Sequence, residues 1–260
     1  MVFILTANKK DTMELLLIIF IAFFIAVLFS LLGLGGAIIY TPLFYWSGLP
    51  LLTAIPMALL LNMITTASAS ITYLKQKMVD TRIALPIILT SLPGAYVGSK
   101  LARIINMDIL ILLLSISIFF AGIRILFLEI KGTSIISPEK RILAGALAGF
   151  VISAVSSLVG IGGGTFIMPL LLAFGLETKN AVGTSALIVM FISLFGFLSH
   201  MSQGGQHTDM IILIFAGIAA FSGAQAGSRL IFGRTSPRTI ERMFALVLLV
   251  VGGKLLYGLL

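Results

Sequence analysis

The hydrophobic positions of this chain gather into long apolar runs separated by short polar connections. A helix needs about 20 apolar residues to cross a bilayer. Eight runs approach or reach that length: 13–32, 51–74, 83–102, 109–128, 142–159, 181–199, 210–230 and 243–260. Two further apolar segments, 37–46 and 165–174, have only half of it. The pattern predicts an all-α polytopic membrane protein with about eight long helices and two half-length helices.

Each half-length segment begins directly after a cluster of glycines. The first cluster contains Gly33, Gly35 and Gly36, and the second contains Gly160 and residues 162–164. A glycine inside a helix costs about 1 kcal/mol relative to alanine. Lipid also offers no partner to the backbone groups that a broken helix exposes. Each cluster therefore predicts a helix break whose backbone is buried in protein or lines a water-filled cavity.

The two halves of the chain carry one pattern twice. At an offset of 127 residues, six positions of the first half match six of the second: Gly33, Gly35, Gly36, Pro42, Gly48 and Ala54; Gly160, Gly162, Gly163, Pro169, Gly175 and Ala181. At an offset of 129, residues 94–101 match residues 223–230, and Asp80 matches Asp209. We expect both aspartates to cap the helices that follow them. The matches predict two homologous repeats, residues 1–132 and 133–260.

The basic residues favour one of two arrangements of these repeats. If each broken helix completes a single crossing, each repeat has four crossings, and the 17 Lys and Arg residues split 10 to 7 between the two sides. If each broken helix is a re-entrant hairpin, each repeat has three transmembrane helices and the repeats are inverted. Twelve basic residues then share one side, and the other five are Lys9, Lys10, Lys100, Arg103 and Lys254. Basic residues concentrate on the cytoplasmic side, so we predict inverted repeats with both termini outside.

Composition excludes several functional classes. Charged residues make up only 10% of the chain and hydrophobic residues 59%, whereas soluble domains carry about 25% charged residues. Basic residues beside membrane spans explain the net charge of +8 without a nucleic-acid partner. The chain has no cysteine, and His200 and His207 share one polar connection, so we expect no metal site. Enzyme motifs are absent, and we predict neither an enzyme nor a cofactor.

The glycine breaks carry the candidate chemistry. The first N–H groups of a helix lack intrahelical acceptors, and the helix dipole is positive at that end. Glycine allows a ligand to approach the backbone closely. Two such N-termini facing each other would bind a small anion near the bilayer midplane without a buried lysine. The predicted binding residues are Gly35, Gly36, Ala37, Gly162, Gly163, Gly164 and Thr165, supported by Asn62, Thr184 and Ser185.

These residues also have purely structural explanations. Small residues allow membrane helices to pack closely. We favour that role for four glycines within the spans: Gly94, Gly98, Gly223 and Gly227. Ser and Thr hydroxyls often bond their own helix backbone, so Thr184 and Ser185 taken singly favour a structural role. A mid-membrane amide such as that of Asn62 needs a partner, and we weigh packing and substrate contact equally there.

The charged side chains lie near the ends of the predicted spans. Lys100 and Arg229 occupy matching positions, where they either attract an anion at each mouth or extend to the lipid headgroups, which we favour. All nine carboxylates lie in connections or near span ends, so no buried proton relay is predicted. If protons drive this protein, they would travel on the substrate or through Asp80 or Asp209.

In this order, the motifs resemble the sulfite exporter TauE/SafE family of membrane transporters over nearly the whole chain. The resemblance rests on the twin glycine clusters with Pro42 and Pro169, residues 181–185 (Ala-Val-Gly-Thr-Ser), the two aspartate positions and the Gly-Ala-x-x-Gly segments. It implies movement of small sulfur-containing anions, such as sulfite or organosulfonates, across the cytoplasmic membrane. Two departures make the halves unequal: Ala37 stands opposite Gly164, and residues 57–58 (Met-Ala) stand opposite Thr184 and Ser185.

We therefore predict a secondary transporter that exports small oxyanions, a multi-pass protein whose two repeats form one transport domain. Alternating access would rock one repeat against the other around the midplane site. Two other functions stay open. One is a passive anion channel or related-anion permease in which the breaks form a filter, and the other is a structural subunit with a vestigial site. The expected partners are a small anion, with or without coupled protons, and the lipid bilayer.

Overall fold

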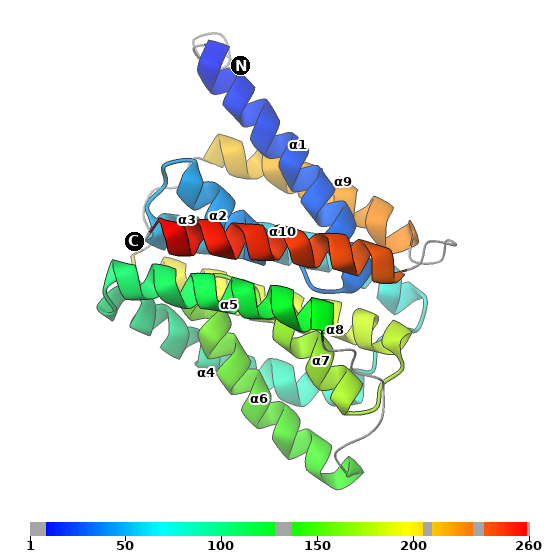
Figure 1. The fold of residues 1–260 in the computed structure, drawn as a ribbon. Coiled ribbons are helices and arrows are strands. Elements are labelled where there is room, and N and C mark those ends of the chain that lie inside the picture. The colour runs from blue at the N-terminus through cyan, green and yellow to red at the C-terminus, as the bar shows by residue number, and fades with distance from the viewer. Residues whose placement is uncertain (1–8, 128–136, 205–209, 231–236, 259–260) are drawn as a thin grey trace.

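The computed structural model describes residues 9–127, 137–204, 210–230 and 237–258 (Figure 1). All regular secondary structure in this described part is α-helical, without a strand. Its helices are α1 (Lys9–Leu32), α2 (Ala37–Trp46), α3 (Leu51–Lys75), α4 (Thr81–Ile104), α5 (Met107–Phe127), α6 (Pro138–Val159), α7 (Gly164–Ala173), α8 (Thr178–Ser202), α9 (Met210–Leu230) and α10 (Pro237–Tyr257). Every predicted run, long or half-length, coincides with one of these helices, which confirms the all-helical prediction.

Local sequence explains several helix ends. Asp80 accepts hydrogen bonds from the backbone N–H groups of Arg82 and Ile83, and it caps α4 as predicted. Asp209 lies outside the described residues. α6 ends at Gly160, whose φ of +75° is the left-handed conformation that commonly terminates a helix. Pro138 begins α6, where the missing N–H of proline would have no intrahelical acceptor.

Helices from the first half of the chain pack mainly against helices from the second half. α1 lies beside α9, α4 beside α6, α5 beside α10, and α3 beside α8. Figure 1 shows α1 and α6 at opposite ends of the molecule, with α5 and α10 side by side between them. The half-helices α2 and α7 pack against α3 and α8 respectively. The two halves therefore share their packing surfaces and do not form separate bundles.

α3 and α8 run antiparallel. Leu59 of α3 lies against Gly196 of α8, and Asn62, one turn further along α3, bonds to Ser193, one turn earlier in α8. α5 and α10 are also antiparallel, because Phe119 contacts Gly252 and Gly122 contacts Ala245. Each of these two central pairs thus joins helices of opposite direction.

α4 and α6 run parallel, and glycines permit their close approach. A Cβ on Gly94 would collide with the carbonyl group of Phe150, and one on Gly98 with that of Ala154. The corresponding contacts between α1 and α9 are Gly223 with Phe23 and Gly227 with Val27. Because backbone atoms cannot move aside as a flexible side chain can, these four glycines are explained by helix packing, as the sequence indicated.

The outer surface carries many large apolar side chains. Phe20, Leu89 and Leu147 are each more than 60% exposed. Contiguous apolar surface of this kind is unusual on a soluble monomer but is stable against lipid tails. Four described helical segments are long and apolar enough to cross a membrane: α3, α5, α8 and residues 140–159 of α6. Together these features identify a polytopic membrane protein.

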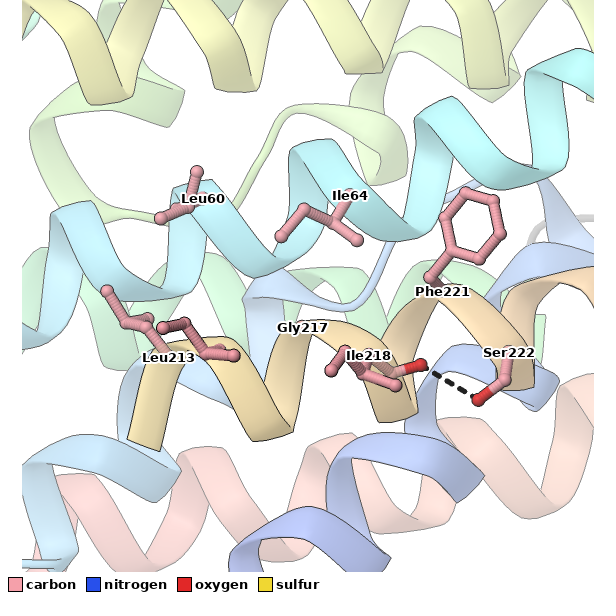
Figure 2. A pocket seen from close by; sticks show the side chains of 8 residues that line it. Leu60, Ile64, Leu213, Gly217, Ile218, Phe221 and Ser222 are labelled. Carbon is pink, nitrogen blue, oxygen red and sulfur yellow. Dashed lines mark hydrogen bonds between the residues drawn. The ribbon is translucent and has the colours of Figure 1, made fainter. Parts of the chain in front are cut away.

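An apolar groove of about 460 Å³ lies between α3 and α9. Figure 2 shows Leu60 and Ile64 of α3 facing Leu213 and Ile218 of α9 across it. The hydroxyl group of Ser222 at its edge is bonded to the carbonyl oxygen of Ile218. The lining therefore offers an anion no free hydrogen-bond donor, and the groove is not the predicted anion site.

Candidate functional site

The two glycine breaks meet at Asn62, in the middle of α3. The Asn62 side chain is fully buried. A Cβ on Gly35 or on Gly162 would overlap its amide group. The breaks also touch each other directly, because a Cβ on Gly164 would collide with the carbonyl oxygen of Leu34. The structure thus brings together most of the residues predicted for the site, with Asn62 between the two breaks.

Each half-helix begins directly after its break and packs against the helix that follows it, α2 against α3 and α7 against α8. At the first break, the N–H of Leu34 donates to the carbonyl oxygen of Phe29, and the Tyr40 hydroxyl donates to that of Ala22, 3.1 Å away in α1. At the second break, Gly163 lies against Ile152 of α6. Five glycines of the breaks have φ angles between +64° and +79°, which residues other than glycine rarely adopt: Gly33, Gly35, Gly160, Gly162 and Gly163.

The N-terminus of α7 has backbone donors to spare. α7 begins at Gly164 and has no side-chain cap. Among the hydrogen bonds of the described residues, none uses the N–H groups of residues 162–165, and the buried Thr165 hydroxyl has no partner either. Buried N–H groups are nearly always paired in folded proteins. Together with the positive end of the helix dipole, these donors are suited to an oxyanion.

At the N-terminus of α2, the N–H of Ala37 is bonded to Asn62. Its Oδ1 accepts a hydrogen bond from the N–H of Ala37 at 3.0 Å, and its Nδ2 donates to Ser193 Oγ at 2.7 Å. The partial negative charge of an amide oxygen disfavours an anion at the same place. Val189 holds the corresponding position in the second half and cannot cap α7. Asn62 therefore uses one backbone donor at the N-terminus of α2, whereas at the N-terminus of α7 no side chain uses any.

Ser185 bonds to the backbone of the first break, and Thr184 bonds to the backbone at the start of α4. Ser185 Oγ donates to the carbonyl oxygen of Gly33 at 2.8 Å, and Thr184 Oγ1 accepts from the N–H of Asp80 at 2.9 Å. Thr41 of α2 donates in the converse direction, to the carbonyl oxygen of Gly160. A hydroxyl from each half of the chain thus fixes the break of the other half.

Lys100 and Arg229 do not join the group of residues around Asn62. Both side chains are exposed, and they lie near the C-terminal ends of α4 and α9. Their predicted roles, at an anion mouth or among lipid headgroups, both require such exposure.

The prediction that His200 belongs to a polar connection is wrong. His200 lies in the last turn of α8, is only 2% exposed, and places Nε2 2.8 Å from the carbonyl oxygen of Ser157. α8 continues beyond its apolar run because α4 packs against its end, where Arg103 donates to the His200 carbonyl oxygen. His207 lies outside the described residues. Within the described ranges, no three His, Cys, Asp or Glu side chains gather to hold a metal.

Sequence analysis missed two side chains that hold the breaks in place. The Tyr73 hydroxyl donates to the carbonyl oxygen of Ser30, just as His200 Nε2 bonds that of Ser157. Tyr73 and His200 are 127 positions apart, as are Ser30 and Ser157. The offset that aligned the glycines could have found this pair, but a search for identical residues passes over a tyrosine aligned with a histidine.

Comparisons with known proteins give the family. The protein-family model described as "Sulfite exporter TauE/SafE" matches residues 18–255. The "Probable membrane transporter protein YunE" of Bacillus subtilis (strain 168) is 28% identical over 260 residues, covering 88% of this chain and 92% of that protein. A "Probable membrane transporter protein" of Haemophilus influenzae is 31% identical over 186 residues, covering 65% and 66%.

A plant relative is similar over a shorter stretch. "Sulfite exporter TauE/SafE family protein 2" of Arabidopsis thaliana is 30% identical over 103 residues, which is 38% of this chain and 21% of that protein. No solved structure matches the chain. The matched family range contains both glycine breaks and Asn62. This protein therefore belongs to the sulfite exporter TauE/SafE family of membrane transporters.

Proposed function

We propose that this protein is a secondary transporter that exports small sulfur-containing anions, such as sulfite or an organosulfonate, across the cytoplasmic membrane. The description of the family and the name of the Arabidopsis relative support this class of cargo. The apolar helices and the names of the bacterial relatives support a multi-pass location in the membrane.

The observation that carries the proposal is the set of unused donors at the N-terminus of α7. Three backbone N–H groups of residues 162–164, that of Thr165 and the Thr165 hydroxyl are buried without partners. A sulfite or sulfonate group carries three oxygen atoms that accept hydrogen bonds. A cation would be repelled by the same helix end. The arrangement therefore favours an oxyanion over a cation or an apolar solute.

The other predicted residues form the surroundings of this anion site. Gly35, Gly36 and Ala37 form the opposite wall, because the first break packs against the second. Asn62 holds that wall in register through its bonds to Ala37 and Ser193. Thr184 and Ser185 act as supports, since the Ser185 hydroxyl fixes the backbone of the first break and the Thr184 hydroxyl fixes the start of α4. In this arrangement the anion is bound off the centre, on the side of α7.

We further infer that the two repeats are inverted and that each broken helix is a re-entrant hairpin. The bond between Arg103 and His200 joins the ends of α4 and α8. If the broken helix formed by α6 and α7 crossed the membrane, three crossings would separate these ends and they would lie on opposite sides. If it returns, only two crossings separate them and they lie on the same side. Lys254 Nζ lies 4.4 Å from the ring centre of Trp46, so the ends of α10 and α2 also lie together. These two ends, too, share one side of the membrane only if the broken helix returns. The antiparallel pairing of α3 with α8 agrees with this arrangement.

Transport from such a site requires the two breaks to separate. Gly164 packs against Leu34 and Gly162 against Asn62, so the site is closed in this structure. Rocking of one repeat against the other would open the α7 N-terminus to each side in turn. A closed site of this kind supports a carrier over a permanently open channel.

Counterflow in proteoliposomes tests the proposed function. Vesicles preloaded with unlabelled sulfite should accumulate radiolabelled sulfite transiently and with saturation, whereas protein-free vesicles should not. A flux that rises linearly with concentration, without counterflow, would instead make the protein a channel. Absence of flux with sulfite, sulfate and a short alkyl sulfonate would contradict the proposal.

A further inference from the structure

We propose that Tyr73 and His200 are positioning residues that hold the two glycine breaks closed, and that protonation of His200 releases the second break. We call the bond from Tyr73 to Ser30 and the bond from His200 to Ser157 the two latches. This inference rests on the proposed transport function, because a latch matters only if the breaks move. It adds a proton-sensitive residue outside the anion site and places it at one end of the molecule.

The two latches have the same geometry. Tyr73 donates its hydroxyl proton to the carbonyl oxygen of Ser30, and His200 Nε2 lies 2.8 Å from that of Ser157. Both acceptors lie three residues before the first glycine of a break. All four residues are buried, none being more than 2% exposed. Each bond therefore ties the helix that enters a break to the far end of α3 or α8.

The latches lie at opposite ends of the molecule. Tyr73 is near the C-terminus of α3 and His200 near the C-terminus of α8. Because these two helices are antiparallel, their C-termini point in opposite directions. A transporter with alternating access needs one closure on each side of its site. Tyr73 and His200 meet that requirement.

The chemistry of the two latches differs in one respect. A carbonyl oxygen can only accept, so His200 must carry a proton on Nε2, and Nδ1 is free to take a second proton. Unperturbed histidine changes charge in the physiological pH range, whereas tyrosine does not. Acidification can therefore change the His200 latch while leaving the Tyr73 latch unaltered.

The surroundings of His200 decide the direction of this change. From α4, the guanidinium group of Arg103 faces it and donates to its carbonyl oxygen. From α6, Ser157 provides only neutral groups, and from α3 the apolar Leu59 lies against Gly196, one turn before His200 in α8. Among the described residues, no carboxylate pairs with the imidazole. Burying an imidazolium beside an arginine costs free energy that exposure to water removes. Protonation therefore favours the released arrangement.

Single cysteines can report on each latch without a transport assay. The chain has no cysteine of its own. Ser157→Cys reports on the His200 latch, and the Ser157 hydroxyl that it removes has no partner. Ser30→Cys is the matched control at the Tyr73 latch. In lipid nanodiscs, a charged thiol reagent reaches both faces of the protein, and its rate of labelling measures release.

We expect acidification from about pH 8 to about pH 5.5 to raise the relative labelling rate of Ser157→Cys about tenfold. The reference rate is that of the same cysteine in a His200→Tyr background, which cancels the pH dependence of the thiol itself. Tyrosine keeps a donor but does not titrate in this range. For Ser30→Cys, the ratio of the labelling rates in the His200 and His200→Tyr backgrounds should not change with pH.

Placing a histidine at the Tyr73 latch provides a second test. Tyr73→His should transfer the acid response to Ser30→Cys, measured against the unmodified Tyr73 background. An equal pH response of Ser157→Cys with His200 intact and in the His200→Tyr background would overturn the latch proposal, even if counterflow is normal. Failure of counterflow in the unmodified protein, with an intact acid response, would instead contradict the proposed transport function.

Discussion

Arg103 Nη2 lies 3.1 Å from the carbonyl oxygen of His200, and this bond joins the last turns of α4 and α8. The two residues are far apart in sequence, and the broken helix formed by α6 and α7 lies between them. The C-terminal ends of α4 and α8 lie on the same side of the membrane if that helix returns, and on opposite sides if it crosses. The contact is therefore the sharpest structural support for a re-entrant second hairpin.

Accessibility tags test this topology. A tag inserted after Gly204 and one at residue 134 should react from opposite sides of the membrane, with residue 134 cytoplasmic. A tag at Ser47, in the turn after α2, should share the side of Gly204, because Trp46 lies against Lys254. Labelling of single cysteines in intact cells with an impermeant maleimide measures this. Reaction of residues 134 and 204 from the same side would contradict the re-entrant arrangement.

Removal of the Asn62 amide should destabilise the fold. Asn62→Leu leaves the N–H of Ala37 and the hydroxyl of Ser193 buried without their partner. Each such loss costs about 1–3 kcal/mol. Thermal unfolding in detergent measures the change. The control is Thr66→Val, because the Thr66 hydroxyl bonds only carbonyl groups of its own helix. Equal melting temperatures for the two variants would show that Asn62 does not join the breaks.

Capping of α7 should abolish anion binding without unfolding the protein. Val189→Asn places an amide where the second half lacks one, and its oxygen can accept from the N–H of Gly164 as Asn62 does from Ala37. The amide would then compete with the anion for the same donors. We expect sulfite counterflow to fall at least about tenfold, which corresponds to about 1.4 kcal/mol, while the melting temperature is maintained. Val189→Ala, which adds no acceptor, should keep most of the flux; equal loss in both variants would argue against an anion site here.

The left-handed glycine of the second break should matter more for transport than for stability. Gly163 has φ of +77°, and the atoms nearest to an added Cβ would be side-chain methyl groups of Ile152 and Ile192, none closer than 3.3 Å. Gly48 has φ of +90° with open space around it, so Gly48→Ala carries backbone strain alone. Both alanine variants should lose about 1 kcal/mol of stability.

Only Gly163→Ala should reduce sulfite flux, because it shifts the N–H groups that face the anion. Chemical unfolding and counterflow, measured on the same preparations, separate the two effects. Equal flux in Gly163→Ala and Gly48→Ala would remove Gly163 from the site.

The sequence predicted the helices closely but misplaced His200. Apolar length and glycine clusters act locally, so they reveal where α1 to α10 lie and where two of them break. The end of α8 depends on a neighbour: Arg103 and the packing of α4 extend the helix beyond its apolar run and bury the imidazole. A polar composition around residue 200 therefore suggested a connection where the fold has a helix.

The sequence by itself determined a polytopic helical chain, two glycine breaks and the residue types around them, because bilayer thickness and glycine conformation restrict short stretches directly. Only the tertiary structure decided that a side chain caps one half-helix and not the other. The Asn62 side chain caps Ala37, which lies 25 positions away in the chain, and Val189 leaves Gly164 without a cap. A hydrogen bond forms only when donor and acceptor come within about 3 Å, and for these residues only the packing of α3 and α8 against both breaks sets that distance.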